Sequence, residues 1–285
     1  MLRTAAEWRL EDIAYTEAGL EHRDSSPRFL LVHGLGGARR QWCTVQEQLA
    51  RHAYSIAVDV PGFGDSRTRD RFDVHGATRK LARFVRHRGL DDCVLVSHSI
   101  GSTVAALLAA DGGMRFQRSI LVSGTLFRAV GVAQRPWQML TRGRLGLTVA
   151  AQFLVGMIPV SAAARRLLAA SRWVRRLALW PFVAAPHALD PHCVARALEG
   201  SGSPTVLRVL LDARRIDFPA MVGAIPHPVD LVWGAHDRLI NAEDIVTAAG
   251  LCDVANRHEI RDCGHWPMIE RTEELVALFL KWGSR

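Results

Sequence analysis

The sequence predicts an α/β fold: a mostly parallel central sheet with helices on both faces, plus a helical cap inserted after the sixth strand. Short apolar runs alternate with stretches of helical periodicity through the first 124 residues, and such alternation is typical of parallel sheets. The run FLLVHG at 29–34 is continuously apolar, as expected of a strand buried on both faces. A strand-free stretch of roughly ninety residues then interrupts the pattern, far longer than an ordinary connection.

Strands are predicted where apolar runs end at turn-forming residues. In chain order they occupy 7–12, 13–19, 29–34, 54–60, 92–98, 119–124, 228–234 and 255–260. Helices are predicted where apolar residues recur every three or four positions. They occupy 38–50, 74–89, 100–113, 241–250 and 270–283.

The interruption divides the chain into two parts. Residues 1–124 and 218–285 are predicted to form the α/β core, and residues 125–217 the helical cap, or lid. A length of 285 residues suits one α/β domain that carries such an insertion.

Composition excludes several classes of protein. The five cysteines are scattered without a CxxC pair, so neither a disulfide framework nor a zinc site is expected. No apolar run is long enough to span a bilayer, and the first residues lack the apolar segment of a secretion signal. A cytoplasmic location is therefore expected.

The net charge of +8 does not predict a nucleic-acid partner. Almost all the basic residues are arginines, they are spread along the chain, and no nucleic-acid-binding motif accompanies them. The charge leaves attraction to acidic partners open.

The segment LVSHSIGS at 95–102 joins a predicted strand to a predicted helix. A nucleophile at such a turn needs small residues two positions before and two after it. Only Ser99 meets this requirement, because its neighbours are Ser97 and Gly101. The amide of Ile100 then lies at a helix N-terminus, where it can face developing negative charge. Taken alone, the segment is equally consistent with serines that cap a helix.

A serine nucleophile needs a base and a group that orients the base, here in the chain order Ser, Asp, His. Asp237 follows the strand at 228–234, and His265 lies between the last strand and the last helix. Both lie at carboxyl ends of strands, at the same edge as Ser99. The other histidines, His33, His98 and His236, are expected in structural or solvent-facing roles.

The glycines of HGLGG at 33–37 permit a tight loop in which the amide of Leu35 faces the same place as that of Ile100. The loop contains no nucleotide-binding pattern. The segment HALDPHC at 187–193 has no recognised metal-ligand spacing. Neither a cofactor nor a metal is expected.

Together these segments resemble the α/β-hydrolase superfamily, in its cap-bearing branch. HGLGG resembles the oxyanion loop of that superfamily, DVPGFGDS the turn after its fourth strand, SHSIG its nucleophile elbow, WGAHDRLI its acid loop and GHWPMIE its histidine loop. The resemblance implies a catalytic triad of Ser99, Asp237 and His265, with the amides of Leu35 and Ile100 as oxyanion donors. Two positions depart from the pattern: Ser97 stands where Gly is usual, and Asn241 where Pro is common.

The expected function is a serine hydrolase that cleaves an ester, lactone or thioester of an apolar substrate through an acyl-enzyme. Trp266 is expected to line the substrate pocket. Two alternatives use the same scaffold: a hydrolase of carbon–carbon bonds, which the GHW segment resembles, and a biosynthetic lyase or cyclase. A third is a non-catalytic binding protein. A serine at position 99 disfavours dehalogenase and epoxide hydrolase activity, because the members of the superfamily with these activities carry Asp at the matching position.

The cap sequence leaves several roles open. In residues 163–180, Trp173, Leu177 and Trp180 share one helical face, and Arg165, Arg172 and Arg176 share another. We expect this apolar stripe to pack on the core, as in an ordinary amphipathic helix. The alternatives are a roof over an apolar substrate, contact with a membrane surface, and docking of an acidic carrier or a coenzyme A thioester. Membrane contact is not expected, and the sequence carries no signal for an oligomeric state.

Overall fold

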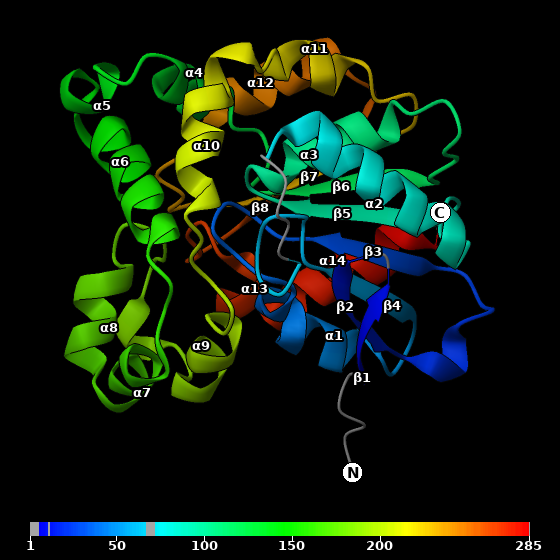
Figure 1. Ribbon diagram of the computed structural model, residues 1–285, viewed down its shortest axis with the longest axis horizontal. Coiled ribbons are helices and arrows are strands. Elements are labelled where there is room, and N and C mark those ends of the chain that lie inside the picture. The colour runs from blue at the N-terminus through cyan, green and yellow to red at the C-terminus, as the bar shows by residue number, and fades with distance from the viewer. Residues whose placement is uncertain (1–5, 11, 67–71, 285) are drawn as a thin grey trace.

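The computed structural model describes residues 6–10, 12–66 and 72–284. They contain one eight-stranded sheet in the order β1-β2-β4-β3-β5-β6-β7-β8 (Figure 1). β1 and β2 pair antiparallel, as do β2 and β4, and all other pairs are parallel. The strands are β1 Ala6–Leu10, β2 Ile13–Ala18, β3 Arg28–Val32, β4 Tyr54–Val58, β5 Val94–His98, β6 Arg118–Val122, β7 Val229–Gly234 and β8 Val254–Ile260. The predicted α/β fold with a mostly parallel sheet is confirmed.

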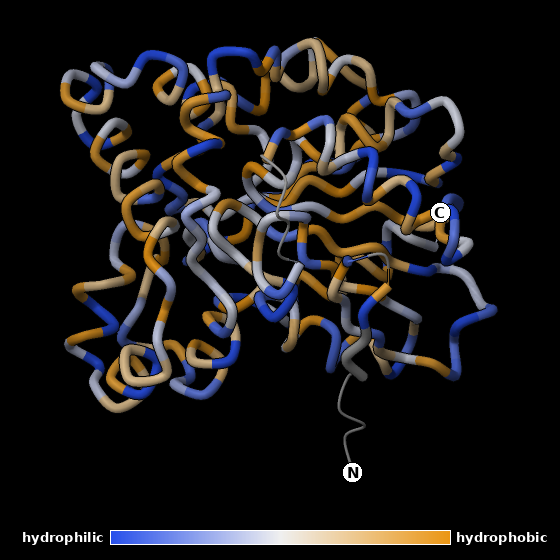
Figure 2. Tube along the Cα trace, in the orientation of Figure 1, coloured by the Kyte–Doolittle hydropathy of each residue, from blue (hydrophilic) through white to orange (hydrophobic). Residues whose placement is uncertain are grey.

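Alternate residues of the buried strands pack into two cores, one on each face of the sheet. Along β3, Leu30 and Val32 join the core beneath α2 and α3, whereas Phe29 and Leu31 join the core beneath α1 and α14. The helices on the face of Leu30 and Val32 are α2 Val74–Arg88, α3 Gly101–Ala109, α11 Phe218–Gly223 and α12 Ala242–Leu251. The helices on the face of Phe29 and Leu31 are α1 Cys43–Leu49, α13 Pro267–Glu270 and α14 Thr272–Gly283. The strands in the middle of the sheet accordingly appear mostly orange in Figure 2.

The segment from 125 to 217, which we call the cap, contains helices and no strand among its described residues. Its α-helices are α4 Phe127–Gln134, α5 Gln138–Thr141, α6 Gly143–Met157, α7 Ala162–Ala170, α8 Arg172–Leu179, α9 Pro191–Ala197 and α10 Thr205–Asp212. Most of these helices lie beyond one end of the sheet (Figure 1). The expectation that the α8 stripe packs on the core is wrong, because Trp173 is 63% exposed and Leu177 78% exposed.

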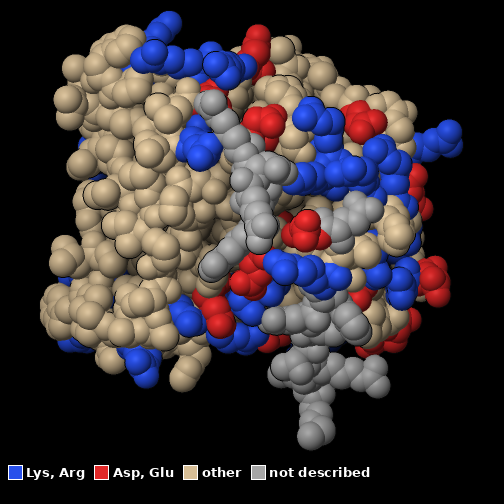
Figure 3. Space-filling model, viewed as in Figure 1, with Lys and Arg blue, Asp and Glu red and all other residues tan. Residues whose placement is uncertain are grey.

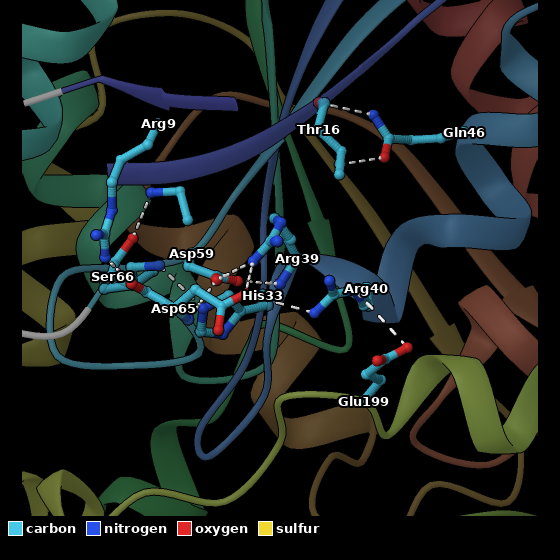
Figure 4. A network of polar contacts seen from close by, with 12 residues as sticks. Arg9, Thr16, His33, Arg39, Arg40, Gln46, Asp59, Asp65, Ser66 and Glu199 are labelled. Atoms are coloured by element: carbon cyan, nitrogen blue, oxygen red, sulfur yellow. Dashed lines mark hydrogen bonds and ion pairs between the residues drawn. The ribbon is translucent and has the colours of Figure 1, made fainter. Parts of the chain in front are cut away.

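The predicted helix at 38–50 begins as a 3-10 helix, Arg39–Trp42, before α1. The reason is a buried carboxylate at the end of β4 (Figure 4). Asp59 accepts a hydrogen bond from the Arg39 amide and forms an ion pair with its guanidinium, both side chains being almost fully buried. Asp59 also accepts from the Asp65 amide at 2.7 Å. This carboxylate therefore joins the turn after β4 to the chain that follows the 33–37 loop.

Candidate active site

Ser99 lies at the corner between β5, which ends at His98, and α3, which begins at Gly101. Its φ of 54° falls in the left-handed region, which residues other than glycine rarely adopt. Such a conformation costs roughly 1–3 kcal/mol and persists only where the surrounding structure holds it. Part of that support is visible here, because the Ser99 amide donates to the carbonyl of Val122 on β6 at 3.0 Å.

Two glycines allow the chain segments to cross closely at this corner. A Cβ atom on Gly101 would lie 2.2 Å from the carbonyl oxygen of His33, and a Cβ on Gly34 would lie 2.8 Å from Nδ1 of His98. The small residue expected two positions after Ser99 is thus required by the backbone of the neighbouring loop. On the other side, Ser97 is fully buried and its Oγ lies 3.0 Å from Oγ of Ser102.

The structure brings Ser99, His265 and Asp237 into one hydrogen-bonded row. Oγ of Ser99 lies 2.8 Å from Nε2 of His265, and Nδ1 of His265 lies 2.8 Å from Oδ2 of Asp237. The other oxygen of Asp237 accepts from the Leu239 amide at 2.9 Å, which fixes the orientation of the carboxylate. The three residues follow β5, β8 and β7, so the parallel pairing of these strands through β6 brings them to the same edge of the sheet.

A partly buried glutamate that sequence analysis did not single out holds the histidine loop. Oε2 of Glu270 accepts from the amides of Ala184 and Gly264 at 2.7 and 2.9 Å, and Oε1 accepts from the Trp266 amide at 3.1 Å. Burial raises the pKa of the Glu270 carboxyl, and these three amides oppose the rise. Glu270 thus ties the loop on both sides of His265 to the cap segment at 184. The sequence signal for this role was the position of Glu270 at the end of GHWPMIE, the segment that resembles the histidine loop.

The histidines at 33 and 98 take the structural roles expected of them. Nε2 of His33 accepts from the Val60 amide at 3.0 Å, while Nδ1 lies 2.8 Å from the Gly34 carbonyl. Nε2 of His98 lies 2.8 Å from the carbonyl oxygen of His265. Burial lowers the pKa of both rings, so both are neutral near pH 7. His236 is more than half exposed, as expected.

The amides of Leu35 and Ile100 are available to a ligand, since within the described chain neither donates to a protein acceptor. Both residues line one cavity together with Ser99. Ile100 precedes the first residue of α3, so its amide is at the positive end of that helix dipole. The two predicted donors and the predicted nucleophile therefore face a common space.

The cap holds the loop that carries Leu35. Gly36 has a φ of 66°, and a Cβ there would lie 2.6 Å from Cα of Gly156 on α6. The Gly36 carbonyl accepts from the Gly202 amide at 2.7 Å, and the Gly156 carbonyl accepts from the Ser203 amide at 2.8 Å. These contacts couple the position of the Leu35 amide to the position of the cap.

The cavity at Ser99 is apolar apart from one side chain. Its walls come from α4, α6 and the loop after β7: Leu126, Ala129, Val130, Ala133, Val149, Gln152, Phe153 and Leu239. Oε1 of Gln152 is buried and has no hydrogen-bond partner within the described structure, while its Nε2 lies 3.4 Å from the Leu35 carbonyl. A buried acceptor without a partner is costly. Gln152 therefore provides an unpaired hydrogen-bond acceptor in the wall of an otherwise apolar cavity. Periodicity in the cap sequence did not distinguish it.

Trp266 lines a second cavity together with Leu35, His98 and Gln152. Its ring stacks on Phe182 with centroids 5.7 Å apart and planes inclined by 8°. Leu35 and Gln152 border both cavities, so the cavity lined by Trp266 adjoins the one that contains Ser99.

Asn241, which stands where the resemblance suggests Pro, caps α12. Its side chain accepts from the Asp244 amide, and the Asp244 carboxylate accepts from the Asn241 amide at 3.0 Å. Asp244 also accepts from the Arg128 amide of α4 at 3.0 Å. This reciprocal cap therefore begins α12 and attaches the first cap helix to the core.

Among the residues that the structure describes, no three His, Cys, Asp or Glu side chains lie together as a metal site requires. The helices described here include none that is both long and apolar enough to cross a bilayer.

Comparison with known proteins identifies relatives over nearly the whole chain. The model described as "Alpha/beta hydrolase family" matches residues 29–278. The magnesium-chelatase 30 kDa subunit of Rhodobacter capsulatus is 25% identical over 271 residues, which cover 90% of this chain and 86% of that protein. The dihydrolipoyllysine-residue acetyltransferase component of the acetoin cleaving system of Pseudomonas putida is 28% identical over 220 residues, covering 75% of this chain and only 52% of that protein.

Among solved structures, E-2-(acetamidomethylene)succinate hydrolase matches with a TM-score of 0.73 and 15% identity, covering 99% of this chain and all of that one. At this level of identity the match concerns the fold.

We predict that Glu270→Gln lowers both the melting temperature and the turnover number. The NH₂ group of the glutamine side chain would replace a carboxylate oxygen that now accepts from a backbone N–H. The N–H left without an acceptor costs about 1–3 kcal/mol and loosens the loop around His265. Thermal unfolding and steady-state kinetics measure the two effects. The matched control is Glu273→Gln, an exposed carboxylate in the first turn of α14. Equal behaviour of the two variants would show that Glu270 does not hold the loop.

Proposed function

We propose that this chain, which belongs to the alpha/beta hydrolase family, is a serine hydrolase that cleaves an ester, lactone or thioester of an apolar substrate through an acyl-enzyme. One observation carries the proposal: the unbroken row of hydrogen bonds from Asp237 through His265 to Ser99, with both bonds at 2.8 Å. Such a row activates a hydroxyl that is otherwise a weak nucleophile.

The geometry suggests the following reaction. Oγ of Ser99 attacks the substrate carbonyl carbon as Nε2 of His265 takes the hydroxyl proton, and Asp237 stabilises the imidazolium through Nδ1–H. The carbonyl oxygen gains the negative charge and receives hydrogen bonds from the amides of Leu35 and Ile100. His265 then gives the proton to the leaving group, and water attacks the acyl-enzyme by the same route to release the acid and restore Ser99.

The cavity beside Ser99 supports an apolar acyl group as the part of the substrate that enters it. Almost all its walls are aliphatic or aromatic, and ligand pockets of this kind select by shape with a few placed polar groups. We propose that Gln152 supplies that polar group and that Trp266 contacts the part of the substrate beyond it. A leaving group joined to a carrier protein or to coenzyme A is compatible with this arrangement, because only the acyl part needs to enter the cavity.

We expect Ser99→Ala to reduce ester hydrolysis at least about a thousandfold, since loss of a triad serine removes the nucleophile. A fluorophosphonate probe should label the wild-type protein at Ser99 and leave the variant unlabelled, as read by mass spectrometry of the peptide. Ser102→Ala is the matched control, because Ser102 is a buried serine one turn away that contacts Ser97. Absence of labelling in the wild type would favour a non-catalytic binding protein.

A substrate screen separates hydrolysis of esters from the two alternative chemistries. p-Nitrophenyl esters of increasing chain length test the proposal and measure the length of the acyl pocket, and a ring-cleavage dienone tests carbon–carbon hydrolysis. We expect ester turnover with one atom of ¹⁸O from labelled water in the acid. Turnover of the dienone alone, or turnover without incorporation from water, would contradict the proposal in favour of a carbon–carbon hydrolase or a lyase.

We predict that Gln152→Leu changes selectivity more than it changes activity. Loss of the buried acceptor should reduce kcat/KM about tenfold for acyl groups that carry a hydroxyl or amide donor, because the donor is then unpaired. All-hydrocarbon acyl groups should be affected little. Kinetics with paired esters that differ only in the donor measure this, with Gln138→Leu in α5 as the control. A uniform loss across both esters would contradict a selective role.

We further propose that the protein acts in the cytoplasm, in the same process as a magnesium chelatase. The relative that bears this name aligns with 90% of the present chain, so the alignment includes most of the cap that covers Ser99. Deletion of the gene should lower the cellular pool of the magnesium chelate that a magnesium chelatase forms, measured by chromatography. The wild-type gene should restore the pool and the Ser99→Ala gene should not. An unchanged pool after deletion would contradict this setting while leaving the hydrolase chemistry intact.

A further inference from the structure

The cap exposes an apolar surface that the described chain does not cover. Fifteen large apolar side chains are exposed among the described residues, and twelve of them lie in the cap. We define the apolar cap surface by six of them on α5, α6, α8 and the turn before α5: Trp137, Leu140, Leu147, Leu154, Trp173 and Leu177. These helices lie along the side of the molecule farthest from the sheet (Figure 1), and in Figure 3 the basic side chains of the cap lie mostly around the edges of a broad area without charged side chains. Exposed large apolar side chains gathered on one side of a molecule are typical of an interaction site.

The orientation of α8 is held by an arginine that points inward. Arg175 is 6% exposed, and its Nη1 donates to the carbonyls of Leu168 and Ala169 at the end of α7, both at 2.8 Å. Leu179 is buried on the same side, whereas Trp173 and Leu177 point outward. An amphipathic helix that packed its apolar face on a core would show the opposite arrangement. The outward stripe is thus a built feature of the cap and not a frayed element.

The positive charge of the chain is concentrated in the cap, residues 125–217. Thirteen arginines and four carboxylates give residues 125–217 a net charge of +9. The rest of the chain has 23 basic and 24 acidic residues, a net charge of −1. The whole-chain value of +8 therefore reflects the cap alone, and the partner that this surface attracts is anionic.

Arginine and tryptophan meet on the apolar cap surface and at its margin. The guanidinium groups of Arg172 and Arg176 lie 5.4 and 5.9 Å from the centre of the Trp173 ring, and that of Arg238 lies 5.2 Å from the Trp180 ring. Tryptophan rings favour the boundary between lipid headgroups and acyl chains, and guanidinium groups bind the phosphates there. The arginine–tryptophan pairs therefore combine the preference of tryptophan for the headgroup boundary with the affinity of arginine for phosphate.

We propose that the apolar cap surface docks the protein onto an anionic lipid surface. A bilayer with anionic headgroups matches both properties of this side of the molecule, its apolar area and its positive charge. A second copy of the chain would match the apolar area only, because it would bring one cap of charge +9 against another. An acidic protein would match the charge, but α5, α6 and α8 present a surface spread over several helices and not a groove for a protruding segment.

Docking in this way places the lipid close to the cavity at Ser99. α6 exposes Leu147 and Leu154 on its outer side, while Val149, Gln152 and Phe153 on its inner side line that cavity. One helix diameter, about 10 Å with side chains, thus separates the two. Docking itself needs no chemistry at Ser99, so it stands whether or not the proposed hydrolase activity is correct.

The test is flotation of the full chain with lipid vesicles. The wild-type protein should float with phosphatidylcholine vesicles that contain about 30% phosphatidylglycerol, and salt at about 0.5 M should weaken the association. Leu140→Ser with Leu177→Ser should lower the partition coefficient at least about tenfold, because both side chains are almost fully exposed and would enter the lipid. Arg172→Gln with Arg176→Gln should weaken binding to the anionic vesicles only.

The matched control removes two exposed apolar side chains outside the cap, Leu20→Ser with Val246→Ser, and should bind as the wild type does. Circular dichroism verifies that each variant is folded. Failure of the wild type to float, or equal loss in the cap variant and the control, would overturn the proposal. So would a dimer, seen by light scattering, that only the Leu140→Ser and Leu177→Ser variant abolishes, because the surface would then join two copies of the chain.

Discussion

The left-handed backbone of Ser99 is the constraint on which the site depends. A non-glycine residue with a φ of 54° raises its side chain above the end of β5, where Oγ can meet Nε2 of His265. The same bend places the next residue, Ile100, in the wall of the cavity that contains Ser99. The bend is possible because Gly101 lies against the carbonyl of His33, where any Cβ would collide. The strain is thus maintained by the close approach of two β–α corners, and without it the nucleophile, the base and one oxyanion donor would not face the same point.

The cap contributes to the site as well as covering it. Gly156 of the cap contacts Gly36 in the 33–37 loop, and the Phe182 carbonyl of the cap accepts a hydrogen bond from the His265 amide. The cap also provides Gln152 to the cavity wall. A displacement of the cap would therefore change the position of the Leu35 amide together with the shape of the cavity at Ser99. The outer side of the same helices carries the exposed apolar residues and the positive charge. One inserted segment thus carries the contact with the 33–37 loop, part of the cavity wall at Ser99 and the exposed apolar residues.

Local sequence rules predicted the sheet and the positions of the triad residues well, for reasons that particular residues illustrate. Ser99 was identified because only its neighbours are small, and Asp237 and His265 because each follows a strand of a parallel sheet, whose carboxyl ends share an edge. The rules failed where a distant group decides the outcome. The 3-10 turn at Arg39 depends on the Asp59 carboxylate twenty positions away, and Glu270 acts on an amide of the cap at Ala184. The outward stripe of α8 depends on Arg175 binding carbonyls of α7, which reverses the usual orientation of an amphipathic helix.

The sequence by itself determined the fold class, the family resemblance and which serine, aspartate and histidine would meet. These follow from strand and helix periodicity and from short segments whose backbone requirements are local. Only the tertiary structure decided which side of each cap helix faces the cavity at Ser99, that Gln152 is a polar side chain in its wall, and that Trp173 and Leu177 face outward. The physical reason is that a helical pattern defines an apolar face without saying what will cover it. That choice belongs to contacts between segments far apart in the chain, such as the one that buries Arg175.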